Sequence, residues 1–194
     1  MNFLYKILKP VELFIRLIRL ISRFILNNSQ INKINKIGKN FKIGNNFVVH
    51  NEGFIIVGSQ INIANNVEFS TYISGGIEIG NNAFIGDSCK IISENSKIKI
   101  GNDILIAEVV SIRASNHKTN LNNTINKQGN TSKDITIGND VWIGRGVAIL
   151  AGAIIPNGVV IGANSVVSKR CLLEENSIYA GNPLKLINKR SLLS

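Results

Sequence analysis

The sequence predicts an all-β solenoid of parallel strands, built from six-residue repeats and preceded by one amphipathic helix. The repeat is clearest in residues 135–169, where an aliphatic residue stands at every sixth position. A helix repeats every 3.6 residues and a strand every two, so neither gives one aliphatic face at this spacing. We therefore expect stacked coils in which each hexad forms one short strand and one corner. The anchor residues are Ile137, Ile143, Ile149, Ile155, Ile161 and Val167.

Two other features of residues 135–169 agree with this prediction. A small or β-branched residue follows each anchor by four positions, as the narrow interior between stacked coils requires. Gly and Asn are frequent at the expected corners, and both tolerate the positive φ of a sharp turn. The small interior residues are Val141, Val147, Ala153, Val159 and Ser165.

Residues 3–26 differ from the repeats and predict a basic amphipathic helix, which forms a first segment over residues 1–30. Charges interrupt the segment too often for a transmembrane span, and it has no small-residue cleavage site of a signal peptide. Two interpretations stay open: the helix lies on an anionic membrane surface, or it caps the solenoid or packs on another subunit. The charged residues recur at steps of three or four, which defines the polar stripe: Lys6, Lys9, Glu12, Arg16, Arg19 and Arg23.

The six-residue period continues less regularly through the middle of the chain. The segments IGNNFV, IGNNAF, IGNDIL and IGNDVW are versions of one unit, and shifts of phase between them indicate small inserts at corners. We expect the solenoid domain to occupy residues 31–170 and a C-terminal tail to follow over residues 171–194.

One large break interrupts the solenoid at residues 113–134, which are polar and have no hexad anchors. A long excursion from a rigid scaffold is a common place for functional residues. It contains His117, one of two histidines. Imidazole titrates near neutral pH and can act as a general base, an effect of roughly 10²–10⁴-fold in rate. From composition alone, a solvated loop histidine is the competing interpretation.

The formal net charge of +10 favours an anionic partner. The partner could be a nucleotide, a membrane surface or an acidic glycan, and the charge alone does not choose among them. Nucleic acid is not expected, because the basic helix has a wide apolar face.

Two cysteines indicate a reducing compartment, and Cys89 fits a small interior position of a hexad. No metal site is expected, because the histidines are far apart and the cysteines lack zinc-ligand spacing.

The order of several motifs carries a resemblance to a known family. IGNDILIAEVVSI, then SNH, ITIGNDVWIG, VIGANSVVSK and YAGNPLKLI follow one another along the chain. This order resembles the left-handed parallel β-helix acyltransferases of the hexapeptide-repeat superfamily, near the maltose, galactoside, xenobiotic and capsule-sugar O-acetyltransferases. The resemblance covers about residues 37–188. It implies left-handed coiling, a homotrimer and acetyl-CoA as the donor.

The resemblance also implies roles for single residues. His117 matches the loop histidine that deprotonates the acceptor hydroxyl for direct attack on the thioester, without an acyl-enzyme. Trp142 matches a tryptophan that lies beside the thioester in the sialic-acid and polysialic-acid O-acetyltransferases; an ordinary aromatic on the outer face is the alternative.

Five further positions match the family's contacts with coenzyme A. Ala163, Ser168 and Lys169 match the strip along which the pantetheine arm runs between subunits. Lys185, in AGNPLK, matches a residue near the nucleotide end, where an ammonium can contact phosphate. Arg145 matches a contact of the cofactor arm. Lys185 and Arg145 can equally be solvated surface residues.

The sequence departs from the family in two respects. Val109 stands where relatives with small-sugar acceptors often have a polar asparagine. No acidic residue is next to His117 in sequence, so its tautomer is expected to depend on a backbone carbonyl or on Asp103, Glu108 or Asp134.

The function expected from these observations is an acetyl-CoA-dependent O-acetyltransferase acting on a sugar hydroxyl of a surface glycan, such as capsule, sialic acid or lipopolysaccharide. We expect a cytoplasmic protein, with peripheral contact at the inner membrane face through residues 3–26 as the open alternative. N-acetylation of an amino sugar, free or nucleotide-linked, ranks second, because the nucleotide-binding domain common in those enzymes is absent. A noncatalytic binding solenoid ranks third.

Overall fold

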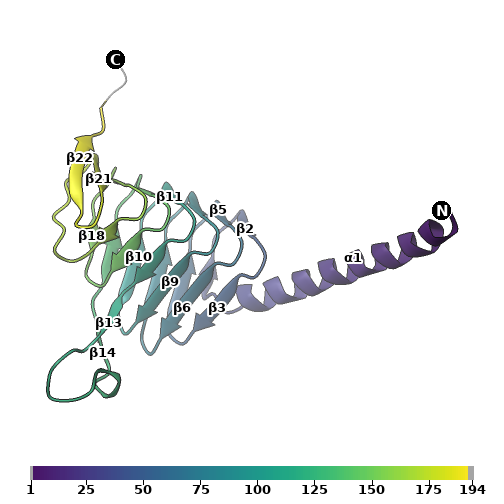
Figure 1. The fold of residues 1–194 in the computed structure, drawn as a ribbon, viewed down its shortest axis with the longest axis horizontal. Helices are drawn as coiled ribbons and strands as arrows, with labels where there is room; N and C mark the ends of the chain where they lie inside the picture. Colours follow the sequence, from purple (N-terminus) through teal and green to yellow (C-terminus); the bar gives the residue numbers. More distant parts are fainter. Residues whose placement is uncertain (1, 192–194) are drawn as a thin grey trace.

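The computed structural model describes residues 2–191, which form one parallel β-solenoid with a long N-terminal helix (Figure 1). Helix α1 (Asn2–Ile31) projects from the end of the solenoid where the chain enters it. The predicted parallel solenoid with an N-terminal amphipathic helix is confirmed. Its left-handed sense of coiling stays a prediction.

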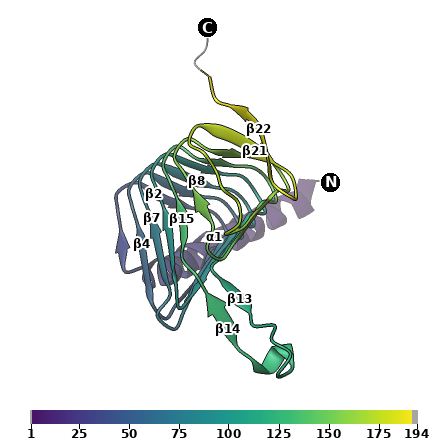
Figure 2. The same cartoon turned by 90° about the vertical axis from the view of Figure 1, so that its left-hand side faces the viewer.

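Three parallel sheets form the sides of the solenoid, as the view nearly along its axis shows (Figure 2). Each turn of the chain contributes one strand to each sheet, so the neighbours within a sheet are strands from successive turns. Sheet A contains β1 (Lys36–Ile37), β4 (Phe54–Val57), β7 (Gly76–Ile79), β10 (Lys97–Ile100), β15 (Ile135–Ile137) and β18 (Ile154–Ile155). Sheet B contains β2 (Phe41–Ile43), β5 (Ile61–Ile63), β8 (Ala83–Ile85), β11 (Ile104–Ile106), β16 (Trp142–Ile143), β19 (Val160–Ile161), β21 (Ser177–Ala180) and the antiparallel β22 (Lys185–Lys189). Sheet C contains β3 (Val48–Asn51), β6 (Glu68–Tyr72), β9 (Lys90–Glu94), β12 (Ser111–Arg113), β17 (Ala148–Leu150) and β20 (Val166–Val167).

The core is a stack of the predicted anchor residues. Ile106 pairs with Ile143, and Ile143 with Ile161, so that one aliphatic side chain lies directly over the next. All six anchors of residues 135–169 are buried, and so are the small residues four positions after them. Full burial of one such aliphatic side chain stabilises the fold by about 1.5–3 kcal/mol. The stack therefore accounts for the regular six-residue spacing.

The corners between sheets A and B are held by a ladder of side-chain oxygens. The backbone N–H of Asn139 donates to Asn157 Oδ1, that of Asn102 to Asn139 Oδ1, and that of Asn81 to Asn102 Oδ1, each at 2.8 Å. Each amide thus satisfies a backbone donor of the neighbouring coil. This role gives a physical reason for the abundance of asparagine at the predicted corners.

The corners between sheets B and C include one residue in a strained backbone conformation. The corner residues Ser88, Val109, Gly146 and Asn164 all have positive φ. Glycine and asparagine adopt this region easily, but Val109, at φ 61°, is β-branched and therefore strained there. Val109 is the residue that departs from the family pattern.

The described contacts of helix α1 with the solenoid lie near its C-terminal end. Gln30 Oε1 accepts a hydrogen bond from the backbone N–H of Val49, and Lys33 Nζ donates to the carbonyl of Val49. Ile34, just beyond the helix, is buried in the core. The described side chains from Leu13 to Leu26 are exposed, so the helix does not cap the first coil of the solenoid within this chain. In the described part of the chain, no helix is both long and apolar enough to cross a membrane.

The C-terminal tail closes the other end of the solenoid. Strand β21 pairs in parallel with β19 and continues sheet B, and β22 folds back on β21. Ser165 Oγ, inside the last coil, accepts a hydrogen bond from the backbone N–H of Gly181 at 2.8 Å and donates to the carbonyl of Gly162. The tail thereby covers the last coil and places the AGNPLK segment beside it.

Candidate active site

The polar break in the repeat forms an ordered hairpin at the corner that leads from sheet C to sheet A. Strands β13 (Ser115–His117) and β14 (Asn130–Ser132) pair antiparallel and extend away from the solenoid (Figures 1 and 2). The Gln128 side chain exchanges two hydrogen bonds with the backbone of Asn120, at 2.9 and 2.8 Å, which orders the tip. The sequence indicated an excursion here but not its strands.

His117 lies at the end of β13, opposite Asn130, and is exposed. It lines a pocket of about 390 Å³ together with Arg113, Ser115, Asn116 and Asn130. Arg113 ends β12 on the outer face of sheet C, so a cationic side chain borders the pocket beside the imidazole. The geometry presents His117 to a small molecule rather than burying it in the fold.

Asn130 ties the histidine-bearing hairpin to the solenoid. Its Nδ2 donates to both carboxylate oxygens of Glu94, at 2.9 and 2.7 Å. Glu94 ends β9, on the coil beneath the hairpin. Since a hydrogen bond to a charged group is stronger than a neutral one, this contact holds the base of the hairpin in place.

The three acidic residues suggested as partners of His117 each bond elsewhere. Asp103 Oδ1 accepts from Asn82 Nδ2, Glu108 Oε1 pairs with Arg145 Nε at 3.0 Å, and Asp134 Oδ1 accepts from the backbone N–H of Lys97. Glu94 is the carboxylate that the structure brings to the hairpin, through Asn130.

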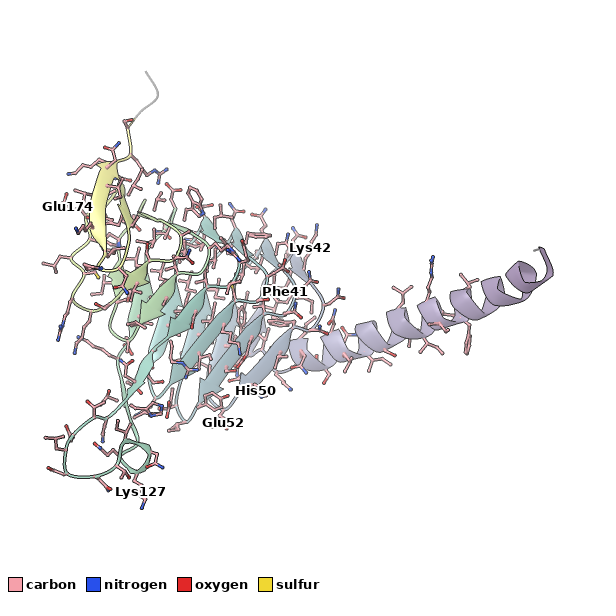
Figure 3. All side chains as sticks on the ribbon, in the orientation of Figure 1. Phe41, Lys42, His50, Glu52, Lys127 and Glu174 are labelled. Carbon is pink, nitrogen blue, oxygen red and sulfur yellow. The ribbon has the colours of Figure 1, made fainter. Side chains whose placement is uncertain are left out.

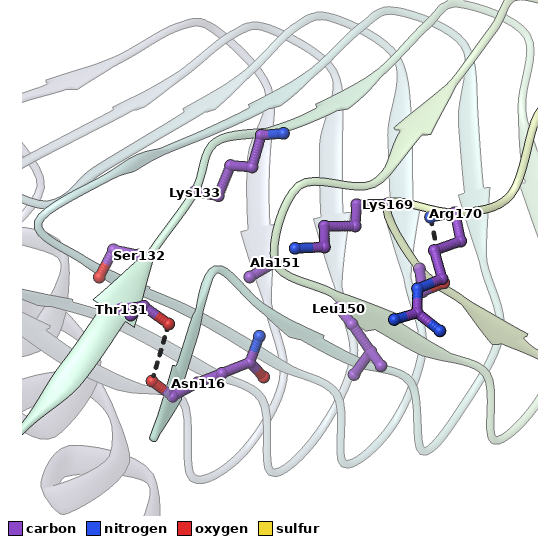
Figure 4. A pocket seen from close by; sticks show the side chains of 9 residues that line it. Asn116, Thr131, Ser132, Lys133, Leu150, Ala151, Lys169 and Arg170 are labelled. Atoms are coloured by element: carbon purple, nitrogen blue, oxygen red, sulfur yellow. Dashed lines mark hydrogen bonds between the residues drawn. The ribbon is translucent and has the colours of Figure 1, made fainter. Parts of the chain in front are cut away.

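A second pocket, of about 520 Å³, lies on the other side of the hairpin (Figure 4). Three cationic side chains border it: Lys133 from the hairpin base, and Lys169 and Arg170 from the segment after β20. In residues 2–191, none of the three forms an ion pair. Unpaired cations around an open pocket fit an anionic ligand.

Gly152 permits two of these lysines to approach each other. Its φ is 82°, and a Cβ there would lie 2.6 Å from Lys133 Cδ and 3.1 Å from Lys169 Cβ. A larger residue would both strain the backbone and push the side chains apart. Ser168 lines the same pocket, so Ser168 and Lys169 of the predicted coenzyme A strip lie together beside the hairpin.

Trp142 lies elsewhere, on the outer face of sheet B, and is 50% exposed. Its strand neighbour Leu105 is 46% exposed, and the next, Phe84, is 39% exposed. These side chains form an apolar row across the sheet. Because the hairpin with His117 leaves the corner between the other two sheets, one chain does not bring Trp142 and His117 to the same face.

The remaining predicted positions lie at the edges. Arg145 and Ala163 are at corners between sheets B and C, and Arg145 is paired with Glu108. Lys185 begins β22 and is exposed. The structure thus brings Ser168 and Lys169 to the hairpin pocket and leaves Arg145, Ala163 and Lys185 outside it.

Cys89 lies in the core, away from the candidate site. Cys89 is buried, its Sγ donates to the carbonyl of Ala107, and burial raises the pKa of the thiol to about 11. This agrees with its predicted interior position. Among the described residues, no group of three or more His, Cys, Asp or Glu side chains is placed to hold a metal ion.

Sequence reasoning missed Arg113, Glu94, Asn130, Lys133 and Arg170. Each lies outside the repeat positions, and the contacts among them come from stacking of coils and from hairpin pairing. Arg113, Asn130 and Lys133 lie within the break at residues 113–134, and Arg170 follows the predicted Lys169, but no local pattern distinguished these residues from their neighbours.

Comparison with known proteins agrees with this architecture. The model of the bacterial transferase hexapeptide family (six repeats) matches residues 134–169. No curated protein sequence matches the chain. The solved structures include similar folds at low identity.

Three of these structures are informative. AntD, an N-acyltransferase from Bacillus cereus in complex with dTDP and 3-hydroxybutyryl-CoA, has 20% identity and a TM-score of 0.70, with 86% of this chain and 88% of that chain covered. A maltose O-acetyltransferase from Clostridium difficile 630 has 24% identity and a TM-score of 0.56, covering 86% and 75%. The polySia-specific acetyltransferase NeuO has 22% identity and a TM-score of 0.55, covering 83% and 88%.

The three similar structures share the fold and, by their names, all transfer acyl groups. Residues 134–169 therefore belong to the bacterial transferase hexapeptide repeats, and the chain has the fold of the hexapeptide-repeat acyltransferases.

Proposed function

We propose that the protein transfers an acyl group, acetyl in the first instance, from its coenzyme A thioester to a sugar hydroxyl of a surface glycan. One observation carries the proposal: the two pockets described above share Asn116 and lie on the two sides of the hairpin that bears His117. Such a pair of pockets can hold a donor and an acceptor on either side of one base.

The larger pocket suits the donor. Coenzyme A supplies an activated thioester carbonyl at one end and phosphates at the other. Lys133, Lys169 and Arg170 would hold the anionic end, since they border the pocket without carboxylate partners in the described chain. The smaller pocket, with His117 and Arg113, suits the acceptor.

His117 acts as the general base in this proposal. The imidazole takes the proton of the acceptor hydroxyl as its oxygen attacks the thioester carbonyl. The C–O bond forms, the C–S bond breaks, and the imidazolium returns the proton to the departing sulfur. Proton and charge balance without a metal or an acyl-enzyme.

A second copy of the chain completes the site in this proposal. Trp142 and its apolar row cannot reach His117 of the same chain, and an exposed apolar row on a flat sheet marks an association surface. In the homotrimer that the resemblance implies, sheet B of one copy would face the hairpin of the next, and Trp142 would flank the thioester.

N-acylation of an amino sugar is the second candidate, and one finding favours it. The TM-score with AntD, 0.70, exceeds those with the two O-acetyltransferases, 0.56 and 0.55. Complexes of AntD contain dTDP or dTDP-4-amino-4,6-dideoxyglucose. The similarity covers 88% of that chain, so a chain of this architecture is compatible with a nucleotide-linked acceptor.

Release of free coenzyme A from acetyl-CoA tests the proposal. The acceptors are sialic acids, neutral oligosaccharides, capsular polymers, amino sugars and a dTDP-linked amino sugar, each with wild type and His117→Ala. We expect acceptor-dependent release that falls by about 10²-fold or more in the variant. The matched control is His50→Ala, which removes the other histidine, on the outer face of β3. Equal release by wild type and His117→Ala would overturn the assignment of the base.

The product separates the two candidates. Mild alkali or hydroxylamine cleaves an ester and leaves an amide intact. A labile product formed on a sugar hydroxyl supports O-acetylation, and a stable product formed only with amino sugars supports N-acylation. If no acceptor gives release, the proposal is overturned, and a noncatalytic binding solenoid becomes the favoured interpretation.

A further inference from the structure

Between Leu13 and Leu26, the described apolar side chains of helix α1 are uncovered and lie around more than half of its circumference. Leu13 is 70% exposed and Leu20 is 61% exposed, although both belong to a segment with few polar residues. Two apolar seams run side by side along this part of the helix, Leu13–Leu17–Leu20 and Phe14–Ile18–Ile21. An exposed surface of this kind needs a partner.

The positive charge of the protein is concentrated at the same end. Residues 1–51 contain nine Lys and Arg and a single acidic residue, Glu12, whereas residues 52–194 contain thirteen Lys and Arg against eleven Asp and Glu. The first 51 residues thus hold +8 of the net charge of +10. The solenoid beyond them is almost neutral.

The first coil contributes to this charge with three exposed lysines, Lys36, Lys39 and Lys42. Within residues 2–191, no carboxylate pairs with any of them, and the first ion pair along the described solenoid is that of Glu68 with Lys90. Figure 3 shows Lys42 at the end of the solenoid from which the helix leaves. The uncovered apolar surface and these cations therefore belong to the same end of the molecule.

We propose that this end of the molecule docks onto an anionic lipid bilayer. The helix lies in the interface with its apolar side chains at the acyl boundary, and the lysines of the first coil contact the headgroups. No described helix is suited to cross the bilayer, so the contact is with one surface. The proposal does not depend on acyl transfer.

Lipid fits these observations better than a second copy of the helix. A parallel helix pair or trio covers one seam of each helix, but here two adjacent seams are apolar. If copies of this end packed together, each chain would bring a net charge of +8 to the contact, and the electrostatic repulsion would oppose association. An anionic bilayer covers both seams and neutralises the charge.

Vesicle cosedimentation with the full-length protein tests the proposal. The probes are phosphatidylcholine vesicles and vesicles of phosphatidylcholine with phosphatidylglycerol. We expect binding to the anionic vesicles that weakens as salt is raised, because the Debye length shortens. Replacing Lys36, Lys39 and Lys42 together with Gln should weaken binding about 10- to 100-fold at low salt. The matched control replaces Lys97, Lys118 and Lys127 with Gln, which lie on sheet A and the hairpin, and should leave binding unchanged.

A second variant, Leu17→Glu with Ile21→Glu, separates lipid from self-association. Loss of vesicle binding with the same mass in solution supports the proposal. The proposal is overturned if the wild-type protein does not bind anionic vesicles. It is also overturned if the double Glu variant has a lower oligomeric mass than the wild type, because the helix would then pack on another copy. Equal binding by the Lys36, Lys39 and Lys42 variant and its control would also count against it.

Discussion

Asn130 Nδ2 lies 2.7 and 2.9 Å from the two carboxylate oxygens of Glu94, although 36 residues separate them in sequence. Asn130 faces His117 across the hairpin, so this bond is the connection between the proposed base and the rigid coil beneath it. Its loss should misplace the imidazole without opening the core.

We expect Asn130→Ala to lower kcat by about 10-fold and to leave the KM for the acyl donor unchanged, because the donor pocket lies on the other side of the hairpin. Glu94→Ala should give the same loss, and the double variant should add little. Asn122→Ala, in the exposed tip of the same hairpin, is the control. Additive losses would show that the two side chains act separately.

Mixing two inactive variants tests whether sites form between chains. His117→Ala and Trp142→Ala remove groups that lie on different faces of one chain. If each site uses one group from each of two neighbours, subunit exchange should restore intact His117 and Trp142 to about one quarter of the sites in a randomly mixed oligomer. If verified subunit exchange restores no activity, either both groups serve a site within one chain or Trp142 takes no part in the site.

The backbone strain at Val109 predicts a stabilising substitution. A β-branched residue at φ 61° is unfavourable by about 1–2 kcal/mol, and asparagine adopts this region readily. Val109→Asn should raise the free energy of unfolding by about 1 kcal/mol and Tm by about 2–4 °C. Val48→Asn, the same change in an extended strand, should not stabilise, and thermal unfolding compares the two. Equal effects would show that the gain is unrelated to φ.

The Glu68 carboxylate predicts an acid-dependent contribution to stability. Burial opposes its ionisation, but hydrogen bonds from Ser70 and Lys90 prevail and lower its pKa below 4.5. When folding lowers the pKa of a carboxyl group, its full contribution to stability is present at pH values above the pKa of the unfolded state. This contribution is lost as the pH falls through the pKa of the folded state.

Glu68→Gln should therefore be less stable than wild type at pH 7, by about 1 kcal/mol, and the difference should vanish in acid. Denaturant unfolding across the acid range measures it. Glu78→Gln, whose carboxylate lies 3.9 Å from Lys99, is the comparison and should change stability less. A difference that persists in acid strong enough to protonate the carboxyl group in both states would mean that packing, rather than charge, causes the loss.

Thiol reactivity should distinguish the two cysteines. Cys89 is buried and its pKa is raised to about 11, whereas Cys171 is only half-buried. A thiol reagent at pH 8 should modify Cys171 first and reach Cys89 only on unfolding. Cys171→Ser should then show no rapid reaction. Rapid modification of two thiols in the wild type would contradict the interior position of Cys89.

The repeat could be predicted from the sequence because its cause is local. Ile143 and Ile149 occupy equivalent points of consecutive hexads, so periodicity alone identifies them as core. The amphipathic helix is also local in origin, but its direction away from the solenoid depends on the contacts of Gln30 and Ile34 at the first coil.

Much of the candidate site could not be predicted because its contacts join coils of unequal length. Corner residues that stack directly are 18 positions apart at Asn139 and Asn157 but 22 apart at Ser59 and Asn81. The pairing of Glu94 with Asn130 therefore follows only once the coils are stacked and the hairpin is formed. Lys169 was identified by resemblance, and its proximity to Lys133 emerged from the fold.

The asparagine ladder has a consequence for how this protein can change. Asn102 and Asn139 are 37 positions apart, yet their bond is 2.8 Å long, the same as between coils without an insertion. The scaffold closes beneath the hairpin as though those residues were absent. Natural variation can therefore exchange, lengthen or shorten this excursion without refolding the coils, and a chimera that receives the hairpin of another solenoid should fold while acquiring a new acceptor preference.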